Sequence, residues 1–231
     1  MDTTAPVVNR FDSTAAWRAV DDYFATLIDE DAALVAARES GARTTMPNAE
    51  VSASQGALLA LLARAAGARR ILEFGTLAGY STIWLARAAG PEGRVVTFEL
   101  DEGNAEIARE NLVAAGVADR VEVIVGPAAD GARGLVADAV DPFDLVFIDA
   151  DKPSNPEYLA ASLHLTHSGS LIVIDNVVRD GAVVHADSDD PRVQGVRAVV
   201  ADIAADARLD ATAIQTVGIK GWDGLVIARR R

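Results

Sequence analysis

The stretch "RRILEFGTLAGYSTIWLARAAG", residues 69–90, decides the fold of this chain. Its first part, "RRILEF", is an apolar run of strand length, and its last part, "YSTIWLARAAG", has the length and composition of a helix. Between them, Gly75 and Gly79 let the backbone turn and pass close to a bound molecule. A strand, a glycine loop and a helix in this order predict the first unit of a doubly wound sheet.

Strands and helices continue to alternate after this unit. Further strands are predicted at 93–100, 120–126, 143–149 and 169–177, and helices at 104–116, 129–138, 156–167 and 192–207. This alternation is typical of a parallel sheet covered by helices on both faces. The last two strands, 212–218 and 222–230, are joined only by "IKG", so they must form an antiparallel hairpin. We therefore predict an α/β fold with a seven-stranded, mostly parallel sheet and a C-terminal antiparallel hairpin strand.

The N-terminal part has a helical pattern of its own. Residues 13–39 repeat apolar side chains at near-helical spacing with acids between them, which predicts one or two amphipathic helices. "GARTTMPNAEV" breaks the pattern, and Ser52 is the predicted N-cap of a helix that ends at Gly67. No repeat or linker interrupts the chain, so we predict one domain over 1–231, with residues 1–50 preceding a core at 51–231. Residues 176–191 form the longest irregular stretch and are a candidate lid.

Composition excludes several classes of protein. The 231 residues carry a formal net charge of −13, which repels nucleic acid and anionic lipid. The absence of cysteine excludes disulfides, thiolate zinc sites and a cysteine nucleophile. Residues 1–30 have no apolar run of signal-peptide length, and no segment approaches the ~20 apolar residues of a membrane span. A soluble cytoplasmic protein without nucleic-acid or membrane partners is expected.

The glycine loop is accompanied by two acids. Glu73 precedes Gly75 in the spacing E-x-G-x-x-x-G, which differs from the pyrophosphate-binding G-x-G-x-x-G and favours a ligand with positive charge. Glu99 ends the next predicted strand, where an acid in such sheets accepts hydrogen bonds from ribose hydroxyls. The alternative is that the glycines only make a tight turn and that Glu99 caps a helix. Residues 126–130 follow the third strand, where an adenine would lie.

Polar side chains also end two later strands. Asp149 follows "LVFI", and Asp175 with Asn176 follows "LIVI". Adjacent parallel strands bring such ends together, and these oxygen ligands suit Mg²⁺, although Mn²⁺ or Ca²⁺ would also fit. The alternative is that both aspartates cap the following helices. Asp151 has three open roles: contact with cofactor, contact with metal, or orientation of Lys152.

Together these residues resemble a known enzyme family. "ILEFGTLAGYSTIWLA", "TFELD", "FIDADK", "IDNV" and the terminal "DGLVIA" are similar to the cation-dependent class I S-adenosylmethionine O-methyltransferases, which include catechol and caffeoyl-CoA O-methyltransferases, and most similar to their small bacterial members. The resemblance implies a Rossmann-like methyltransferase fold, a homodimer, and an acceptor chosen by the N-terminal region and the lid. It implies metal ligation by Asp149, Asp175 and Asn176, and a general base at Lys152. The cofactor contacts that it implies are Val51, Glu73, Gly75, Thr76, Gly79, Ser81, Glu99, Ala128 and Asp149.

The residue types agree with this chemistry. A vicinal diphenol can chelate Mg²⁺ through both oxygens, which fixes the attacking oxygen in line with the sulfonium methyl group. A divalent cation beside Lys152 disfavours the ammonium form, so Lys152 is the expected base. The expected function is methyl transfer to a catechol-like small molecule or its ester. The alternatives are a nicotinamide-dependent oxidoreductase, disfavoured by the missing G-x-G-x-x-G, and a binding protein without turnover.

Other conspicuous side chains have a structural interpretation. His164 and His167 are expected near a helix carboxyl end, where a positive charge is favourable. Trp17, Tyr23 and Trp84 are expected to be packing residues.

Overall fold

The fold is built on one seven-stranded sheet. The computed structural model describes residues 14–231, so the expected helix start at Ser13 lies outside the described residues. The strands are β1 (Arg70–Phe74), β2 (Arg94–Glu99), β3 (Val121–Val125), β4 (Phe143–Ile148), β5 (Thr166–Asp175), β6 (Leu209–Gly218) and β7 (Gly221–Arg230). Their spatial order is β3-β2-β1-β4-β5-β7-β6. Strands β1 to β5 pair in parallel, whereas β7 is antiparallel to both β5 and β6. The predicted fold class is confirmed, with the reversed strand β7 inserted between β5 and the edge strand β6.

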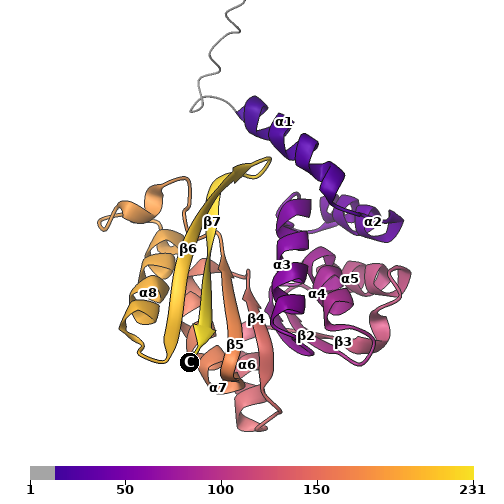
Figure 1. Ribbon diagram of the computed structural model, residues 1–231. Coiled ribbons are helices and arrows are strands. Elements are labelled where there is room, and N and C mark those ends of the chain that lie inside the picture. The colour runs from indigo at the N-terminus through magenta and orange to yellow at the C-terminus, as the bar shows by residue number, and fades with distance from the viewer. Residues whose placement is uncertain (1–13) are drawn as a thin grey trace, which may run out of the picture.

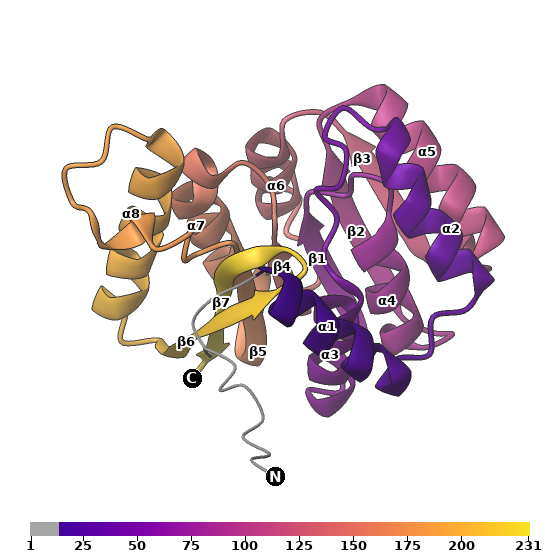
Figure 2. The same cartoon turned by 90° about the horizontal axis from the view of Figure 1, so that it is seen from above.

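Helices cover both faces of this sheet (Figures 1 and 2). They are α1 (Thr14–Phe24), α2 (Ala32–Ser40), α3 (Ala53–Ala65), α4 (Tyr80–Ala89), α5 (Glu102–Ala114), α6 (Ala128–Ala137), α7 (Asn155–Leu165) and α8 (Pro191–Ala205). Successive strand residues point to opposite faces, so Ile71 packs with α3 and α4 while its neighbour Leu72 packs with α7 and α8. Two separate apolar cores result, one on each side of the sheet.

The parallel register brings the functional strand ends to one edge. Phe74 of β1 is paired with both Phe98 of β2 and Ile148 of β4, and Ile148 is paired with Ile174 of β5. The residues that follow these positions therefore lie next to one another, as expected from the alternating pattern.

The first helix, α1, lies beside the C-terminal hairpin of the chain. Helix α1 is beside the tip of the β6–β7 hairpin, where the Ile219 amide donates to Asp21 Oδ2 at 2.6 Å (Figure 1). No residue of α1 is buried, and Tyr23 is 72% exposed, so the packing role predicted for Tyr23 is wrong within this chain; Trp84 is buried as predicted. Within residues 14–231, no helix has the length and apolar character needed to cross a membrane.

The predicted end of the helix at 156–167 is wrong, and this changes the position of His167. Helix α7 ends at Leu165, and His167 lies on β5 instead of the predicted helix end. His167 Nε2 is 3.0 Å from Asp144 Oδ1, and its Nδ1 is 2.8 Å from the Ser168 carbonyl oxygen. That carbonyl and then Asp144 raise the pKa of His167. The run "THSGSLIVID" pairs as a strand from its first residue because Thr166 meets Phe143 of β4.

Candidate functional site

A cavity of about 740 Å³ opens at the carboxyl edge of β1, β2 and β4. This volume lies in the usual range for a cofactor or ligand site. Its walls include nine residues predicted to form the site: Val51, Gly75, Thr76, Ser81, Glu99, Ala128, Asp149, Lys152 and Asn176. Most predicted contacts, which come from distant parts of the chain, therefore meet around one space.

The glycine loop forms the floor of this cavity because β1 and β4 end very close together. Gly75 has φ 98°, and a Cβ on it would lie 2.4 Å from the Asp149 carbonyl oxygen. The amides of Gly75 and Thr76 both donate to the Phe98 carbonyl, at 3.0 and 3.1 Å. Only glycine allows this backbone conformation and this approach of β1 to the backbone that follows β4. The loop also lines the cavity through Gly75, Thr76 and Leu77.

Glu99 is fixed at the end of β2 with its carboxylate at the cavity. Its Oε2 accepts from the Leu77 amide at 2.8 Å, and its Oε1 accepts from the Asn104 side chain at 3.1 Å. The N-cap of α5 is Asp101, whose side chain accepts from the Asn104 amide at 2.9 Å. The alternative in which Glu99 caps the helix is therefore wrong. Oε1 also accepts from the Asp101 amide at 3.1 Å, so Oε2 is the oxygen with a lone pair left for a hydroxyl donor of a ligand.

Glu73, a predicted cofactor contact, is not among the residues that line the cavity. It is fully buried behind the cavity wall, where Oε1 accepts from Ser81 at 2.6 Å and Oε2 accepts from Thr97 at 2.8 Å and from Thr82. Burial raises the pKa of Glu73 to about 7, although the hydroxyl donors act in the opposite direction. Gly79, the N-cap residue of α4, also lies outside the lining. Glu73 thus positions Ser81, which does line the cavity.

The charged strand ends meet as the sequence predicts. Lys152 Nζ is 2.7 Å from Asp149 Oδ1, and the Lys152 residue is only 6% exposed. Asp175, 2% exposed, is the last residue of the neighbouring strand β5, and its burial, then the negative charge of Asp149, raises its pKa. Neither aspartate caps a helix, so that alternative is wrong for both. Asn176 has φ 56°, and its amide donates to Asp175 Oδ1 at 2.7 Å.

The role of Asp151 is defined by its own turn. Its side chain is the N-cap of the short helix η4 (Lys152–Ser154) and accepts from the Ser154 amide at 3.2 Å and the Ser154 hydroxyl at 2.6 Å. It also accepts from the Tyr158 hydroxyl. Burial alone would raise the pKa of Asp151, but these donors outweigh it and lower the pKa. These bonds hold the turn in which Lys152 lies, and Asp151 also lines the large cavity, so its contact with cofactor or metal stays a prediction.

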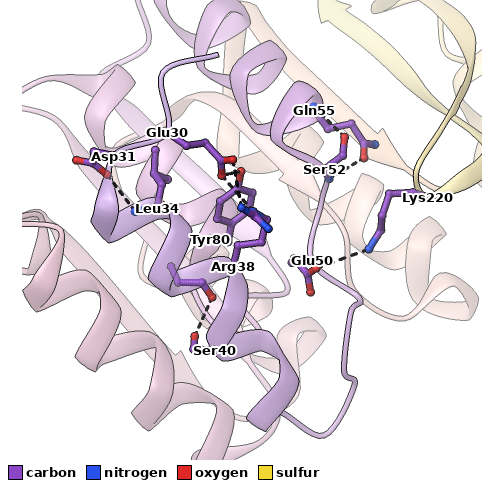
Figure 3. A network of polar contacts seen from close by, with 11 residues as sticks. Glu30, Asp31, Leu34, Arg38, Ser40, Glu50, Ser52, Gln55, Tyr80 and Lys220 are labelled. Atoms are coloured by element: carbon purple, nitrogen blue, oxygen red, sulfur yellow. Dashed lines mark hydrogen bonds and ion pairs between the residues drawn. The ribbon is translucent and has the colours of Figure 1, made fainter. Parts of the chain in front are cut away.

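A second, smaller cavity of about 240 Å³ lies on the other side of Asn176. Its walls come from α1, the start of α3 and the β6–β7 hairpin, and they include Asp175 and Lys220. Lys220 Nζ is 3.9 Å from Glu50 Oε1 across its rim (Figure 3). Ala49, Glu50 and Val51 line both cavities, so the segment before α3 forms the wall between them.

Gln55 is a site residue that the sequence reasoning missed. Its Oε1 accepts from the Ser52 amide at 3.2 Å and completes the capping box of α3 (Figure 3). Its Nε2 donates to both oxygens of Asp175, at 3.2 and 3.3 Å. The pattern S-x-x-Q was a sequence signal for the cap, but nothing in it indicates the contact with a strand 120 residues away.

The N-terminal segment is anchored to the sheet by a buried tyrosine. The Tyr80 hydroxyl donates to Glu30 Oε1 at 2.6 Å, and Arg38 Nε donates to the same oxygen at 3.2 Å (Figure 3). Burial raises the pKa of Tyr80, with the hydrogen bond to Glu30 adding to the effect. These contacts attach α2 to the first turn of α4, directly after the glycine loop.

In residues 14–231, no group of three or more His, Cys, Asp or Glu side chains is arranged to hold a metal ion. The predicted set contains two carboxylates and one carboxamide, Asp149, Asp175 and Asn176, so it falls outside that description. These three side chains still fit a hard cation, because they offer oxygen ligands and because the two acids, whose charges interact, have one ammonium, Lys152, near them.

Comparison with known proteins adds an independent finding. A model of the O-methyltransferase family matches residues 25–231. A catechol O-methyltransferase of Mycobacterium tuberculosis is 53% identical over 203 residues, which cover 88% of this chain and 90% of the relative. A catechol O-methyltransferase of Niastella koreensis is 46% identical over 213 residues, which cover 92% and 96%. The structure of the O-methyltransferase TomG from Streptomyces achromogenes, in complex with SAM, matches with a TM-score of 0.92 at 47% identity and covers 95% of this chain and 99% of that one.

Proposed function

Because the chain belongs to the O-methyltransferase family and is an S-adenosylmethionine-dependent enzyme, we propose that it methylates a hydroxyl of a catechol-like small molecule, or of its ester, with a divalent cation. The observation that carries this proposal is the meeting of Asp149, Lys152, Asp175 and Asn176 beside the glycine-loop cavity. Identity of 53% and 46% with catechol O-methyltransferases supports the acceptor class.

The proposed cation site consists of Asp149, Asp175 and Asn176. A bound Mg²⁺, or Mn²⁺ or Ca²⁺, would supply positive charge for the two neighbouring oxygens of a vicinal diphenol. Burial of Asp175 against a like charge is costly without such a counter-charge. Gln55 holds the Asp175 carboxylate from the other side without neutralising it.

Lys152 is the proposed general base. Its Nζ donates to Asp149 Oδ1 at 2.7 Å and it lines the large cavity, so it lies beside the carboxylate that would hold the cation and within the space proposed for the acceptor. In the proposed reaction the acceptor hydroxyl gives its proton to Lys152 Nζ. The oxygen then forms a bond to the methyl carbon as the carbon–sulfur bond breaks, leaving S-adenosylhomocysteine. Glu99 is proposed to accept from the ribose hydroxyls, and the wall formed by Thr76 and Ser81 to contact the methionine end.

Transfer of labelled methyl from S-adenosylmethionine to catechol tests this function. We expect turnover that is lost in metal-free enzyme and restored by Mg²⁺, and a loss of at least about 100-fold in Lys152→Met, in the usual range for a removed base. Lys220→Met is the matched control, because Lys220 lies at the rim of the smaller cavity. Full activity of Lys152→Met, or of chelated enzyme shown to be metal-free, would contradict the mechanism.

Calorimetry with S-adenosylhomocysteine and NAD addresses the alternatives. We expect S-adenosylhomocysteine to bind and NAD not to bind. Binding of NAD alone would favour the oxidoreductase alternative, whereas cofactor binding without transfer to any acceptor would favour a binding protein.

The proposal includes a homodimer formed by the N-terminal region. Helix α1 and the short helix η1 (Ala25–Leu27) that follows it expose Val20, Tyr23, Phe24 and Leu27 to 52%, 72%, 48% and 80%, an apolar surface that a second copy could cover. Light scattering should therefore give twice the monomer mass, and Leu27→Lys should reduce it. The single domain over 1–231, the phenolic acceptor and the cytoplasmic location remain predictions; neither nucleic acid nor membrane is a proposed partner.

A further inference from the structure

We propose that the Arg179 guanidinium binds a carboxylate on the methyl acceptor, so that the preferred acceptor is a vicinal diphenol with an acidic group. The diphenol part rests on the function proposed above. The acidic group is inferred from Arg179 itself, which lines the large cavity three residues beyond Asn176.

Within residues 14–231, the Arg179 side chain makes neither an ion pair nor a hydrogen bond. Its Nε is buried and has no hydrogen-bond partner, and its guanidinium makes no ion pair within residues 14–231. Most arginines in the described part of the chain have carboxylate or carbonyl partners at their guanidinium groups. In a chain with net charge −13, a partly buried arginine left unpaired inside a ligand cavity is an available anion site.

The backbone holds Arg179 in an unfavourable conformation. Its φ is 56°, in the left-handed region that non-glycine residues seldom adopt, and Asn176 and Asp180 share this conformation with φ 56° and 53°. Asp223 on β7 stabilises the turn, because its Oδ1 accepts from the Val178 amide at 3.1 Å and the Arg179 amide at 3.3 Å. A second bond joins the Asp180 amide to the Trp222 carbonyl at 3.2 Å. A turn fixed in this way reduces the ordering cost of binding a ligand at Arg179.

A second arginine that lines the cavity, Arg192, is paired with Asp190. Arg192 Nη2 is 2.7 Å from Asp190 Oδ2, and Arg192 Nε is 3.0 Å from Asp190 Oδ1. The hydrogen bonds from Arg192 lower the pKa of Asp190 to about 2. Asp190, the acid whose charge Arg179 also influences, is thus already paired. Arg192 lines the same cavity as Arg179 but is not free, which makes it a matched control.

Two carboxylates could reach this cavity: one on the acceptor and the methionine carboxylate of the cofactor. Arg179 follows β5, whereas the glycine loop and Ser81 follow β1, and β4 lies between these two strands. Arg179 is therefore on the side of Asn176 and Lys152, where the acceptor is proposed to react. This placement favours the acceptor's carboxylate.

Binding measured in the presence of S-adenosylhomocysteine and Mg²⁺ tests the proposal independently of turnover. We compare 3,4-dihydroxybenzoate with its neutral analogue 3,4-dihydroxybenzyl alcohol. We expect the wild-type chain to bind the acid about 10- to 100-fold more tightly, the usual range for hydrogen bonds to a charged group. Arg179→Gln should abolish that preference and leave the alcohol unchanged, Arg179→Lys should keep part of it, and Arg192→Gln should keep all of it.

Each result has one meaning for Arg179. Equal binding of the acid and the alcohol by the wild-type chain would overturn the proposal, as would an unchanged preference in Arg179→Gln. Weaker binding of S-adenosylhomocysteine by Arg179→Gln with unaltered acceptor preference would assign Arg179 to the cofactor and overturn it as well. If the acid binds selectively but no methyl is transferred, the proposed function fails and the Arg179 site stands. If both acceptors are methylated, kcat/KM of the wild-type chain should be higher for the acid than for the alcohol by a similar factor, and Arg179→Gln should remove this difference.

Discussion

Replacement of Glu73 by glutamine should change how the stability of this chain depends on pH. The Glu73 carboxyl is fully buried and has no positively charged group among its hydrogen-bond partners, which are the hydroxyls of Ser81, Thr82 and Thr97. Burial raises its pKa to about 7 from its ordinary value of 4.5. Glutamine has nearly the shape of the protonated acid but does not titrate.

The sign follows from which state holds the proton. Between pH 4.5 and 7 the folded chain keeps the Glu73 proton and the unfolded chain has lost it, so the native state binds more protons. The stabilising contribution is complete below pH 4.5 and is lost as pH rises toward 7. Between about pH 5.5 and about pH 8.5 this single group should lower the free energy of unfolding by about 2 kcal/mol, an order-of-magnitude value.

Urea unfolding of the wild-type chain and Glu73→Gln at these two pH values measures the effect. All other titratable groups are the same in both proteins, so the difference between the two pH dependences isolates Glu73. Glu122→Gln, on the exposed side of β3, is the control and should follow the wild type. A Glu73→Gln variant that loses the same stability as the wild type, within about 0.5 kcal/mol, would show that Glu73 is ionised when buried and would refute the reasoning.

Three other substitutions probe how the site is supported. Gly195→Ala should destabilise the chain by about 1–3 kcal/mol in urea unfolding, because the new Cβ would lie 2.1 Å from the Lys152 carbonyl oxygen. It should also lower kcat more than it weakens S-adenosylhomocysteine binding. The control is Gly134→Ala, whose Cβ would meet nothing within 4 Å and which should be neutral or stabilising. Asp223→Ala should lower the free energy of unfolding by about 2–4 kcal/mol in the same assay and weaken Mn²⁺ binding measured by electron paramagnetic resonance, because three backbone amides lose their acceptor. Asp223→Asn should retain most of the stability and most of the Mn²⁺ affinity. Equal Mn²⁺ binding by the wild-type chain, Asp223→Ala and Asp223→Asn would contradict this. Tyr80→Phe should lower thermal stability by about 1–2 kcal/mol because Glu30 loses a donor, and an unchanged melting temperature would show that Arg38 alone suffices.

The sheet and the edge that carries the site could be predicted from the sequence because both depend on local patterns. Apolar runs such as "RILEF" and "FDLVFI" are buried on both faces, and no helix of ordinary length could be drawn through them without including the glycine loop or an acid. Parallel pairing then fixed the neighbours: Asp149 and Asp175 follow paired residues, Ile148 and Ile174. Spacing within a strand and order along the chain are enough for this inference.

Contacts that depend on side-chain direction could not be predicted in the same way. Glu73 precedes the last residue of β1, so its side chain points beneath the first turn of α4, whereas Glu99 is the last residue of its strand and reaches the cavity. Gln55 and Asp175 meet only because α3 packs across the sheet. Arg179 gave no signal beyond its place in an irregular loop, since neither its left-handed backbone nor its lack of a partner can be recognised without tertiary contacts.

The distribution of charge around Asp175 explains why a neutral residue is suited to position 55. Lys152 already donates to Asp149 at 2.7 Å, so a second cation at position 55 would neutralise the remaining acid and leave a cation site without net negative charge. The Gln55 amide fixes both Asp175 oxygens by hydrogen bonds and adds no charge. When both aspartates are ionised, two carboxylates and the Lys152 ammonium leave a net charge of −1 at the strand ends, which would favour the divalent cation proposed above. Arg179, placed beyond Asn176, adds positive charge at the far side of this group, where it can act on an anionic acceptor without competing for either aspartate.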